Sequence, residues 1–469
     1  MQPIRFSILG LILMLFVSCG EQAPIESSTT GPESTELSAL ADEVRSETLR
    51  SWKAYKTYAW GHDVLAPISR THRDWYSEPL YISPIDAYST LVLMGFDEEA
   101  SEVERYVVDS LSFDKDVDVK IFEVNIRILG GLLSMYSHCK NPQVLDKARD
   151  FADRMLPAFN TPTGIPRYWV NLQTGESRGD TVNVAEAASY TFEMGVLSHF
   201  TGDAKYYETG KRATRAVFNR RSDLNLIGEI IDVSSGGWVS TQSHICAGVD
   251  SYYEYLLKSW VLFQDEELKE IWDVSLPVIH EYLADEYEGQ LWYGRSDMTT
   301  GKHVSSMVTL YDAFFPAMLA LSGDTARAVR LQSTWASLWN KYGLEPMVYD
   351  YRTGEPGYPV YDLNPEIMES AYYLSRITGD PQFVAMNKGF WEDLKTHCRT
   401  DVAFASVENV ATMEPRDYMP TFFFAETLKY LYLTFSPNLQ GVHLEDCVFT
   451  TEAHPFRKVD FTEFNVQGQ

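Results

Sequence analysis

The sequence predicts an all-α fold made of seven αα-hairpins. Three segments share one stop signal, because an apolar stretch ends at Gly202-Asp203, at Gly323-Asp324 and at Gly379-Asp380. A glycine just past a helix end accepts the left-handed backbone of the cap, and the aspartate can cap the next helix. Weaker breaks fall near residues 95, 140, 264 and 436. Most of the seven breaks are about 60 residues apart, which is roughly the length of two helices with their loops.

Acidic residues recur at one place in these units. Each lies 13 to 17 residues before its break, near the start of the preceding helix; they are Glu123, Glu186, Asp250 and Glu366. A repeat of this length is typical of an open solenoid or a closed toroid. If the helices that precede the breaks line one ring, the carboxylates converge at one mouth, whereas an open solenoid offers no such convergence. A closed ring with an acidic mouth is suited to carboxylate chemistry.

The composition and the net charge exclude several classes of protein. The 469 residues are 45% hydrophobic and 13% aromatic, which excludes a mainly disordered or collagen-like chain. The formal charge is −27, from 39 Lys+Arg against 66 Asp+Glu. Nucleic-acid binding rests on neutralising phosphates with Lys and Arg, so we expect no nucleic-acid partner. Neutral, polar or cation-assisted ligands suit this balance better.

The N-terminus has the features of a targeting segment. Residues 1–18 combine Arg5 with an apolar stretch over 7–17 that is too short to span a bilayer. The Ser18-Cys19 pair resembles a bacterial lipoprotein cleavage site, which implies lipidation of Cys19; an ordinary signal peptide with an incidental cysteine is the alternative. The implied location is the bacterial cell envelope, on the periplasmic or surface face of the outer membrane, with membrane contact through this anchor alone.

The remaining chain is divided by composition. Residues 19–38 are rich in Ser, Thr, Pro and Glu and predict a flexible tether, followed by one folded barrel over 39–469. Four further cysteines are Cys139, Cys246, Cys398 and Cys447. One disulfide among them is possible, but the sequence does not pair them, and the lack of a CxxC motif argues against zinc.

The segment 121–134 predicts a buried helix with one ion pair. Glu123 and Arg127 stand at i and i+4, where they can meet, either as part of a site or as a structural pair. Gly130 and Gly131 each cost roughly 1 kcal/mol relative to alanine in a helix. Such a cost is usually offset by close packing against a neighbouring helix.

Four further acidic motifs allow both a structural and a functional interpretation. Asp250 opens the segment 250–258 and could be a simple N-cap. In 363–370, Asn364 can cap a helix with Pro365 at its first position, and Glu366 and Glu369 share a face. Glu426 is a lone acid in an apolar helix, so it needs a partner. In 448–455, Thr451 offers a hard oxygen suited to Ca²⁺, or a capping hydroxyl.

Taken together, these motifs resemble glycoside hydrolase family 47, the class I α-1,2-mannosidases. Matching stretches run in family order at 51–55 with 60–63, 122–134, 162–166, 250–258, 365–380, 425–433 and 451–455. The resemblance implies an (α/α)7 barrel, which agrees with the seven breaks. It also implies an inverting, Ca²⁺-dependent exo-α-1,2-mannosidase that acts on terminal mannose of mannose-rich glycans. We expect a monomer.

The resemblance assigns roles by position. It implies that Glu123 is the general acid, Glu366 the general base and Asp250 a third essential carboxylate. Thr451 matches a direct Ca²⁺ ligand through its hydroxyl and carbonyl. The residues implied to bind substrate or calcium-bound water are Arg127, Glu186, Glu193, Glu369, Phe422, Glu426 and Glu452, with Arg127 beside the acid and Phe422 as the aromatic floor.

Three departures from the family pattern bear on branch specificity. Asn364 stands where the family usually has Arg, Met347 where it has Glu, and Ser89 where it has Asp; Ala313 and Ser333 occupy the neighbourhood of a usual cysteine pair. Two alternatives remain: a non-catalytic mannose-binding lectin on the same barrel, and a toroidal glycosidase or lyase acting on another sugar.

Overall fold

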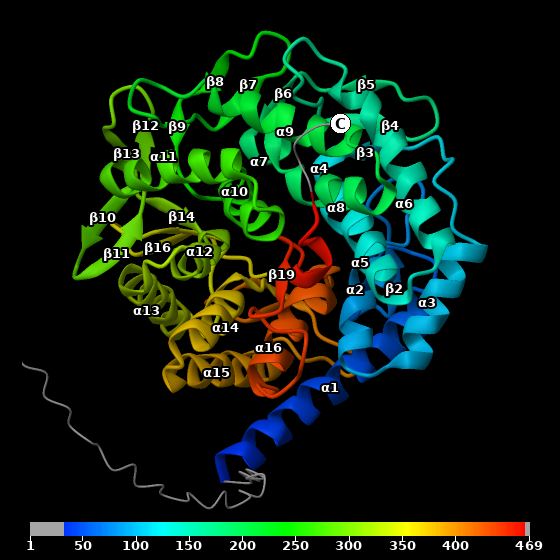
Figure 1. The fold of residues 1–469 in the computed structure, drawn as a ribbon. Helices are drawn as coiled ribbons and strands as arrows, with labels where there is room; N and C mark the ends of the chain where they lie inside the picture. Colours follow the sequence, from blue (N-terminus) through cyan, green and yellow to red (C-terminus); the bar gives the residue numbers. More distant parts are fainter. Residues whose placement is uncertain (1–31, 465–469) are drawn as a thin grey trace, which may run out of the picture.

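The computed structural model describes residues 32–464, which form an (α/α)7 barrel (Figure 1). Seven inner helices surround its axis. They are α2 (Ile82–Leu93), α5 (Gly130–Cys139), α8 (Thr191–Thr201), α10 (Asp250–Phe263), α12 (Phe315–Leu321), α14 (Glu366–Thr378) and α16 (Leu428–Phe435). Inner helices pack against their neighbours, and α2 contacts the turn ahead of α16, which closes the ring. The predicted toroid is confirmed.

Each inner helix ends at a predicted break. At six of the seven, the residue at or just after the helix end has positive φ: Gly95, Lys140, Gly202, Gln264, Gly323 and Gly379, at 54° to 98°. Such a left-handed residue lets the backbone satisfy the last carbonyl groups of the helix. The seventh break, Ser436, has φ −119° and turns without a left-handed residue.

The outer helices return along the outside of the ring. Six of them follow their inner partners: α3 (Asp97–Asp109), α6 (Pro142–Met155), α9 (Lys205–Phe218), α11 (Glu266–Tyr282), α13 (Thr325–Tyr342) and α15 (Pro381–His397). The seventh outer position is taken by the first helix, α1 (Pro32–Tyr58), which packs against α16 (Figure 1). The last hairpin is thus built from the two ends of the fold.

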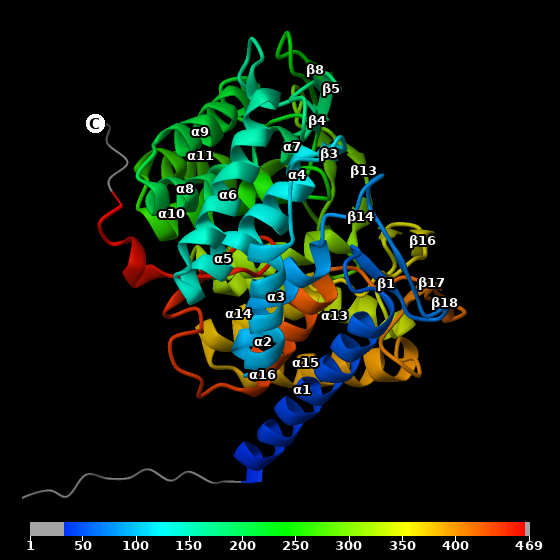
Figure 2. The same ribbon diagram turned by 90° about the vertical axis from the view of Figure 1, so that its right-hand side faces the viewer.

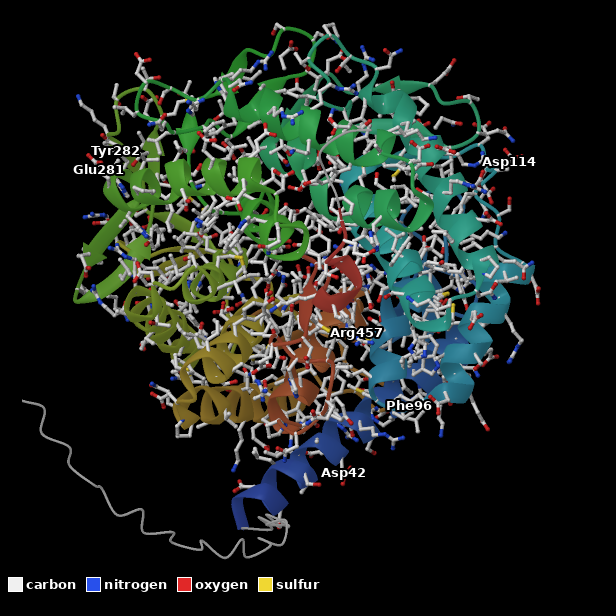
Figure 3. All side chains as sticks on the ribbon, in the orientation of Figure 1. Asp42, Phe96, Asp114, Glu281, Tyr282 and Arg457 are labelled. Atoms are coloured by element: carbon white, nitrogen blue, oxygen red, sulfur yellow. The ribbon has the colours of Figure 1, made fainter. Side chains whose placement is uncertain are left out.

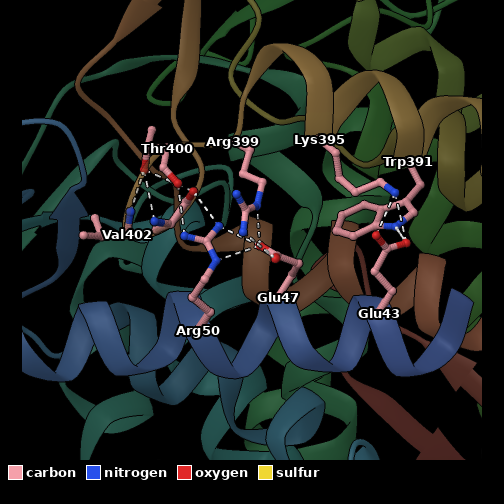
Figure 4. A network of polar contacts seen from close by, with 9 residues as sticks. Glu43, Glu47, Arg50, Trp391, Lys395, Arg399, Thr400 and Val402 are labelled. Carbon is pink, nitrogen blue, oxygen red and sulfur yellow. Dashed lines mark hydrogen bonds and ion pairs between the residues drawn. The ribbon is translucent and has the colours of Figure 1, made fainter. Parts of the chain in front are cut away.

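Ion pairs hold α1 in this position (Figure 4). Glu43 accepts from Lys395 Nζ at 2.8 Å and from the Trp391 indole at 3.1 Å. Glu47 accepts from Arg399 at 3.0 Å. Arg50 donates to the carbonyl oxygens of Thr400 and Ala403 beyond α15. Contacts between residues about 350 positions apart therefore close the ring.

The start of α1 differs from the expected boundary. The helix begins at Pro32, inside the segment 19–38 that we expected to be a flexible tether, and Glu36 pairs with Lys388 on α15. Pro32 suits a first helical turn, and the following sequence contains good helix formers that dock on the barrel. Cys19 and the signal peptide lie outside the described residues, so the lipid anchor stays a prediction.

Most of the short antiparallel hairpins lie at the end of the barrel where the inner helices begin, on one side in Figure 2. The strands are β1 (Val64–Ala66), β2 (Thr71–Arg73), β3 (Asp118–Lys120), β4 (Trp169–Asn171), β5 (Ser177–Arg178), β6 (Thr181–Asn183), β7 (Ile230–Asp232), β8 (Trp238–Ser240), β9 (Gln242–Ser243), β10 (Ala284–Tyr287), β11 (Gln290–Tyr293), β12 (Arg295–Asp297), β13 (His303–Ser305), β14 (Met307–Thr309), β15 (Val348–Asp350), β16 (Glu355–Tyr358), β17 (Ser406–Asn409), β18 (Glu414–Arg416), β19 (Cys447–Phe449) and β20 (Pro455–Arg457). The sequence did not predict them, because two to four residues are too few for an alternating pattern.

Several short helical segments flank the longer elements. They are α4 (Ile121–Val124), α7 (Val184–Ala188), the 3₁₀ turns η2 (Leu156–Phe159), η3 (Leu310–Phe314) and η5 (Lys458–Phe461), and the π-helical turns η1 (Asn125–Leu129) and η4 (Phe423–Thr427). The last hairpin, β19–β20, approaches the barrel axis from the opposite end (Figure 2). The β19–β20 hairpin therefore separates the barrel opening where the inner helices begin from the opposite end, where the inner helices stop.

Two further observations concern the described residues. No helix among them is long and apolar enough to cross a bilayer. Cys139, Cys246, Cys398 and Cys447 are free thiols. The possible disulfide is therefore absent from the described part of the chain.

Gly131 allows α5 to approach α2 closely. A Cβ at this position would lie 2.6 Å from Ile85 Cγ2 and 2.8 Å from the Ile85 carbonyl oxygen. Because the nearest atoms include backbone, the neighbouring helix cannot move aside without disturbing the ring. The expected close packing at the glycine pair is confirmed.

We expect Gly131→Ala to lower the free energy of unfolding by about 1–3 kcal/mol, the usual cost of overpacking. Chemical denaturation measures it. Gly389→Ala is the matched control, since Gly389 lies on the exposed side of α15 with nothing within 4 Å of an added Cβ. That change should stabilise the protein by up to about 1 kcal/mol. Equal effects of the two substitutions would show that helix propensity, rather than packing, decides the result.

Candidate active site

The predicted acidic residues meet in one cavity of about 270 Å³ on the barrel axis. Eight carboxylates line it: Glu123, Glu186, Asp250, Glu254, Glu366, Glu369, Glu426 and Glu452. Among its lining residues in the described chain, Arg127 is the single Arg or Lys. The convergence expected for a closed ring is therefore present, and seven of these eight acids were named from the sequence as site residues.

Glu123 and Arg127 form the predicted pair on the helical stretch that begins with α4. Arg127 Nε donates to Glu123 Oε2 at 3.1 Å. Arg127 also pairs with Glu452 and lies 3.7 Å from Asp86 Oδ2. Burial alone would lower the pKa of Arg127, but these three carboxylates raise it above its ordinary value. The Glu123–Arg127 pair is thus part of the cavity wall. Through Glu452, Arg127 also connects the helical stretch that begins with α4 to the β19–β20 hairpin.

Two π-helical turns shape the cavity wall. Arg127 lies in η1 and Glu426 lies in η4, so each turn carries one charged lining residue. A π turn adds one residue to the helical turn and changes the direction of the side chains around it. The two turns meet where Arg127 Nη1 lies 3.4 Å from Thr421 Oγ1 and its guanidinium lies 5.6 Å from the Phe422 ring centroid.

The second group of acids comes from α7 and α10. The Asn183 side chain caps α7 by accepting from Glu186 N at 2.9 Å. Asp250 is the first residue of α10, and its carboxylate accepts from Ser251 N at 2.8 Å. Burial, together with nearby acids, raises the pKa of Glu186 to about 7 and that of Asp250 to about 8. The N-cap interpretation of Asp250 is wrong, because Val249 occupies the cap position, and Asp250 lies in the cavity wall.

Glu366 and Glu369 at the start of α14 both face the cavity, as their shared helix face predicted. Burial raises the pKa of Glu366 to about 8. The expected cap is wrong in detail: the helix begins at Glu366, and Asn364 does not accept a capping bond but donates to Glu366 Oε1 at 3.4 Å. Asn364 thus contacts the predicted base, whereas Met347 packs against the core and is absent from the cavity lining.

The floor of the cavity comes from the C-terminal part of the chain. Phe422 lies half-buried at the cavity surface. Thr451 and Glu452 stand in the turn between β19 and β20, where Thr450 N donates to His454 O at 3.0 Å. Thr451 N donates to the Tyr255 hydroxyl at 3.3 Å. The last hairpin therefore closes the bottom of the cavity and presents Thr451 to it.

Glu193 is the one predicted sugar-site acid that the structure places outside the cavity lining. It is fully buried on α8, where it accepts from Asn125 Nδ2 at 2.9 Å and from the Tyr255 hydroxyl. Burial raises its pKa to about 8. Because Tyr255 in turn holds Thr451 N, Glu193 supports the floor from behind.

The charge of the cavity fits a bound divalent cation. Burial raises the pKa of Glu426 and Glu452 well above the ordinary range, and Glu452 raises that of Glu426 further. One buried oxygen each of Glu186, Glu366 and Glu452 has no hydrogen-bond partner among the described residues. Many oxygen donors with little positive charge are the donor set that Ca²⁺ prefers.

A second group of metal-binding residue types lies on the β1–β2 hairpin. His62, His72 and Asp74 have ligand atoms within 4.8 Å of one another. His62 Nδ1 is bonded to Asp74 at 2.9 Å, and the two imidazole rings stack in parallel with centroids 3.4 Å apart. Parallel rings direct their nitrogens along parallel lines instead of toward one point. This arrangement is a hydrogen-bonded His62–Asp74 pair with the His72 ring stacked on it.

Glu254 and Tyr311 are two of the lining residues that were not named from the sequence. Glu254 follows Asp250 at i+4 on the same helix face, so this spacing could have identified it. It pairs with Lys258, which also binds Glu369 at 3.2 Å. Tyr311 in η3 gave no signal, because its position depends on how β14 enters the ring.

Three comparisons with known proteins agree. The family model described as glycosyl hydrolase family 47 matches residues 47–458. The chain is 34% identical over 451 residues to Alpha-mannosidase I MNS5 of Arabidopsis thaliana, covering 90% of this chain and 77% of that protein. It is 34% identical to the endoplasmic reticulum mannosyl-oligosaccharide 1,2-alpha-mannosidase of Rattus norvegicus, covering 87% and 66%. The solved alpha-1,2-mannosidase from Trichoderma reesei superposes with a TM-score of 0.82 at 26% identity, covering 90% of this chain and 99% of that one.

Proposed function

Because the chain belongs to glycosyl hydrolase family 47 and is therefore a glycoside hydrolase, we propose that it is an inverting, calcium-dependent exo-α-1,2-mannosidase. The observation that carries the proposal is the gathering of Glu123, Asp250 and Glu366 in one cavity whose floor presents Thr451. The names of the relatives support α-1,2-linked mannose as the substrate. The substrate class is a mannose-rich oligosaccharide or glycan.

The shape of the cavity supports cleavage at a chain end. The turn that carries Thr451 and Glu452 closes the barrel below the cavity, so a glycan enters from the hairpin end and stops at the floor. Phe422 offers an apolar ring face, and carboxylates surround it. A terminal sugar can stack on the ring while its hydroxyl groups bind the acids.

We assign separate catalytic roles to three of the carboxylates. In an inverting hydrolase, one acid protonates the leaving oxygen while a second carboxylate activates water on the opposite face of the sugar, the two lying roughly 6.5–9.5 Å apart. We assign Glu123 as the acid and Glu366 as the base, with Asp250 as a third carboxylate near the reacting centre. Arg127 orients Glu123 through the 3.1 Å bond, and Asn364 orients Glu366.

Thr451 would hold calcium through its hydroxyl and carbonyl oxygens, with the acids around it binding the waters of the ion. When bound, the ion supplies positive charge and coordination for sugar hydroxyl groups. The chain's own residues keep this site polar at the bottom of a buried cavity, and Glu193 with Tyr255 fixes the backbone of Thr451.

The proposal is tested by the stereochemistry of the product. In an inverting hydrolase, water attacks the anomeric carbon directly. The methyl glycoside of α-1,2-linked mannobiose, whose second sugar has no free anomeric centre, should therefore release β-mannose first, before mutarotation. Proton NMR in the first minutes identifies the anomer. The α-1,3- and α-1,6-linked mannobioses serve as controls and should react far more slowly. Early α-mannose would mean retention and would overturn the roles of Glu123 and Glu366, and binding without release would favour the lectin alternative.

A further inference from the structure

Lys429 is a buried ammonium group without a carboxylate partner. It lies on α16 with no exposed surface, and its Nζ donates to Ser89 Oγ at 2.9 Å and to the Ala453 carbonyl oxygen at 2.6 Å. The other two buried lysines of the described chain differ, since Lys211 and Lys258 each form ion pairs with carboxylates. No ion pair to Lys429 occurs within residues 32–464. Burying a charge in this way is unfavourable unless a partner compensates it.

The surroundings of Lys429 agree with a missing counter-charge. Burial lowers its pKa to about 7, although Glu426, Asp86 and Glu452 oppose this shift from a distance. Glu426 and Glu452 line the active-site cavity, and Asp86 and Glu452 also pair with Arg127. Lys429 has three N–H donors and uses two of them on Ser89 and Ala453.

Ser89 and Lys429 line a second cavity of about 360 Å³ at the end of the barrel where α2 and α5 stop. Lys140, His138 and Arg457 also line it, and Asp460 is its one acidic lining residue within the described chain. Figure 3 shows Arg457 near the middle of the ring in this view. Although the chain carries a formal charge of −27, this cavity is basic, whereas the active-site cavity is lined by acids.

We propose that this second cavity binds a small oxyanion, a carboxylate or a phosphate, with Lys429 and the Ser89 hydroxyl as its inner contacts and Lys140 and Arg457 at its entrance. The ammonium group has a donor left for the anion, and the Ser89 hydroxyl hydrogen is free to donate while its oxygen accepts from Lys429. Charge-assisted hydrogen bonds of this kind are the strong ones.

The site is connected to the floor of the active site through one hydrogen bond. Lys429 holds the carbonyl oxygen of Ala453, which has φ 53° in the turn that carries Thr451 and Glu452. An anion bound to Lys429 would share the ammonium group that fixes this turn. It would therefore stabilise the folded protein from the end opposite to the sugar.

The test is isothermal titration of the whole protein with inorganic phosphate, and separately with acetate, at pH 6 and low salt. Both anions should bind wild type, and phosphate should raise the melting temperature. Ser89→Asp supplies an internal carboxylate beside Lys429, so phosphate should bind at least about tenfold more weakly. Ser337→Asp adds the same charge at an exposed position of α13 and should leave binding unchanged.

Two further variants test the site without introducing a buried charge that could unfold the protein. Ser89→Ala adds no charge but removes one hydroxyl contact, so it should weaken phosphate binding much less than Ser89→Asp does. Arg457→Ala removes an exposed entrance cation and should weaken binding severalfold. The absence of binding by both anions to folded wild type would overturn the proposal. Equal phosphate affinity of wild type and a folded Ser89→Asp variant would also overturn it, because the anion would then sit elsewhere.

Discussion

Glu123→Gln should lower kcat on an α-1,2-linked mannobiose by about 10²–10⁴-fold, because the amide cannot protonate the leaving oxygen. KM should stay close to the wild-type value, since the other lining acids are untouched. Glu366→Gln should reduce kcat to a similar extent by removing water activation. Steady-state kinetics measures both effects, and Glu98→Gln on the exposed face of α3 is the control that should change neither constant.

A substrate that needs no acid separates the two roles. Fluoride leaves α-mannosyl fluoride without protonation, so Glu123→Gln should recover most of its turnover on this compound, whereas Glu366→Gln should not. The opposite result would exchange the roles. If both variants kept most of their activity on mannobiose, Asp250, with its pKa raised to about 8, would be the next candidate for the acid.

Removing calcium should abolish mannose release and lower the melting temperature, and added Ca²⁺ should restore both. At a calcium concentration of about 100 times Kd, the ion should contribute about 2.7 kcal/mol to the free energy of unfolding. Chelation followed by Ca²⁺ or Mg²⁺ addition measures this, and Mg²⁺ should restore little because it demands a tighter octahedral shell. Full activity in a demonstrably calcium-free sample would contradict the proposal.

The pH dependence of the same experiment has a defined sign. Asp250 and Glu366 have folded-state pKa values of about 8, above those of the unfolded chain. A carboxyl group with a raised folded-state pKa is tolerated in the folded protein while it is protonated. Its contribution to the free energy of unfolding is present below the unfolded pKa and is lost as pH rises through about 8. The calcium-free protein should therefore be less stable at pH 8 than at pH 5.5, and the stabilisation by Ca²⁺ should increase over this range.

Thr451→Ala should resemble the calcium-free protein, whereas Thr451→Ser keeps the hydroxyl and should not.

The repeat and most of the cavity could be predicted from the sequence because both depend on local signals. Gly202 and Gly379 mark helix ends through their backbone freedom, and the acids recur 13 to 17 residues before such ends. Gly131 likewise indicated close packing, which Ile85 confirms. Signals of this kind can be recognised in the sequence because one residue type satisfies one local structural requirement.

Features that depend on distant contacts could not be predicted. Glu193 has the same residue type and helical context as the lining acids, and only its bonds to Asn125 and Tyr255 place it behind the wall. The π turn that carries Arg127 is joined to the last hairpin by the Arg127–Glu452 ion pair, a contact between residues far apart in the sequence. The roles of the acids, the calcium site and the lipid anchor stay predictions.

The pairing of α1 with α16 has a consequence for how the chain acquires its structure. Glu43 and Arg50 find their partners about 350 residues later, so α1 waits for nearly the whole barrel to be synthesised before it can dock. Contacts so distant in sequence make folding slow, and the earlier hairpins expose apolar faces meanwhile. We therefore expect the complete ring to fold post-translationally, and a nascent chain that lacks the last hairpin should depend on chaperones to remain soluble.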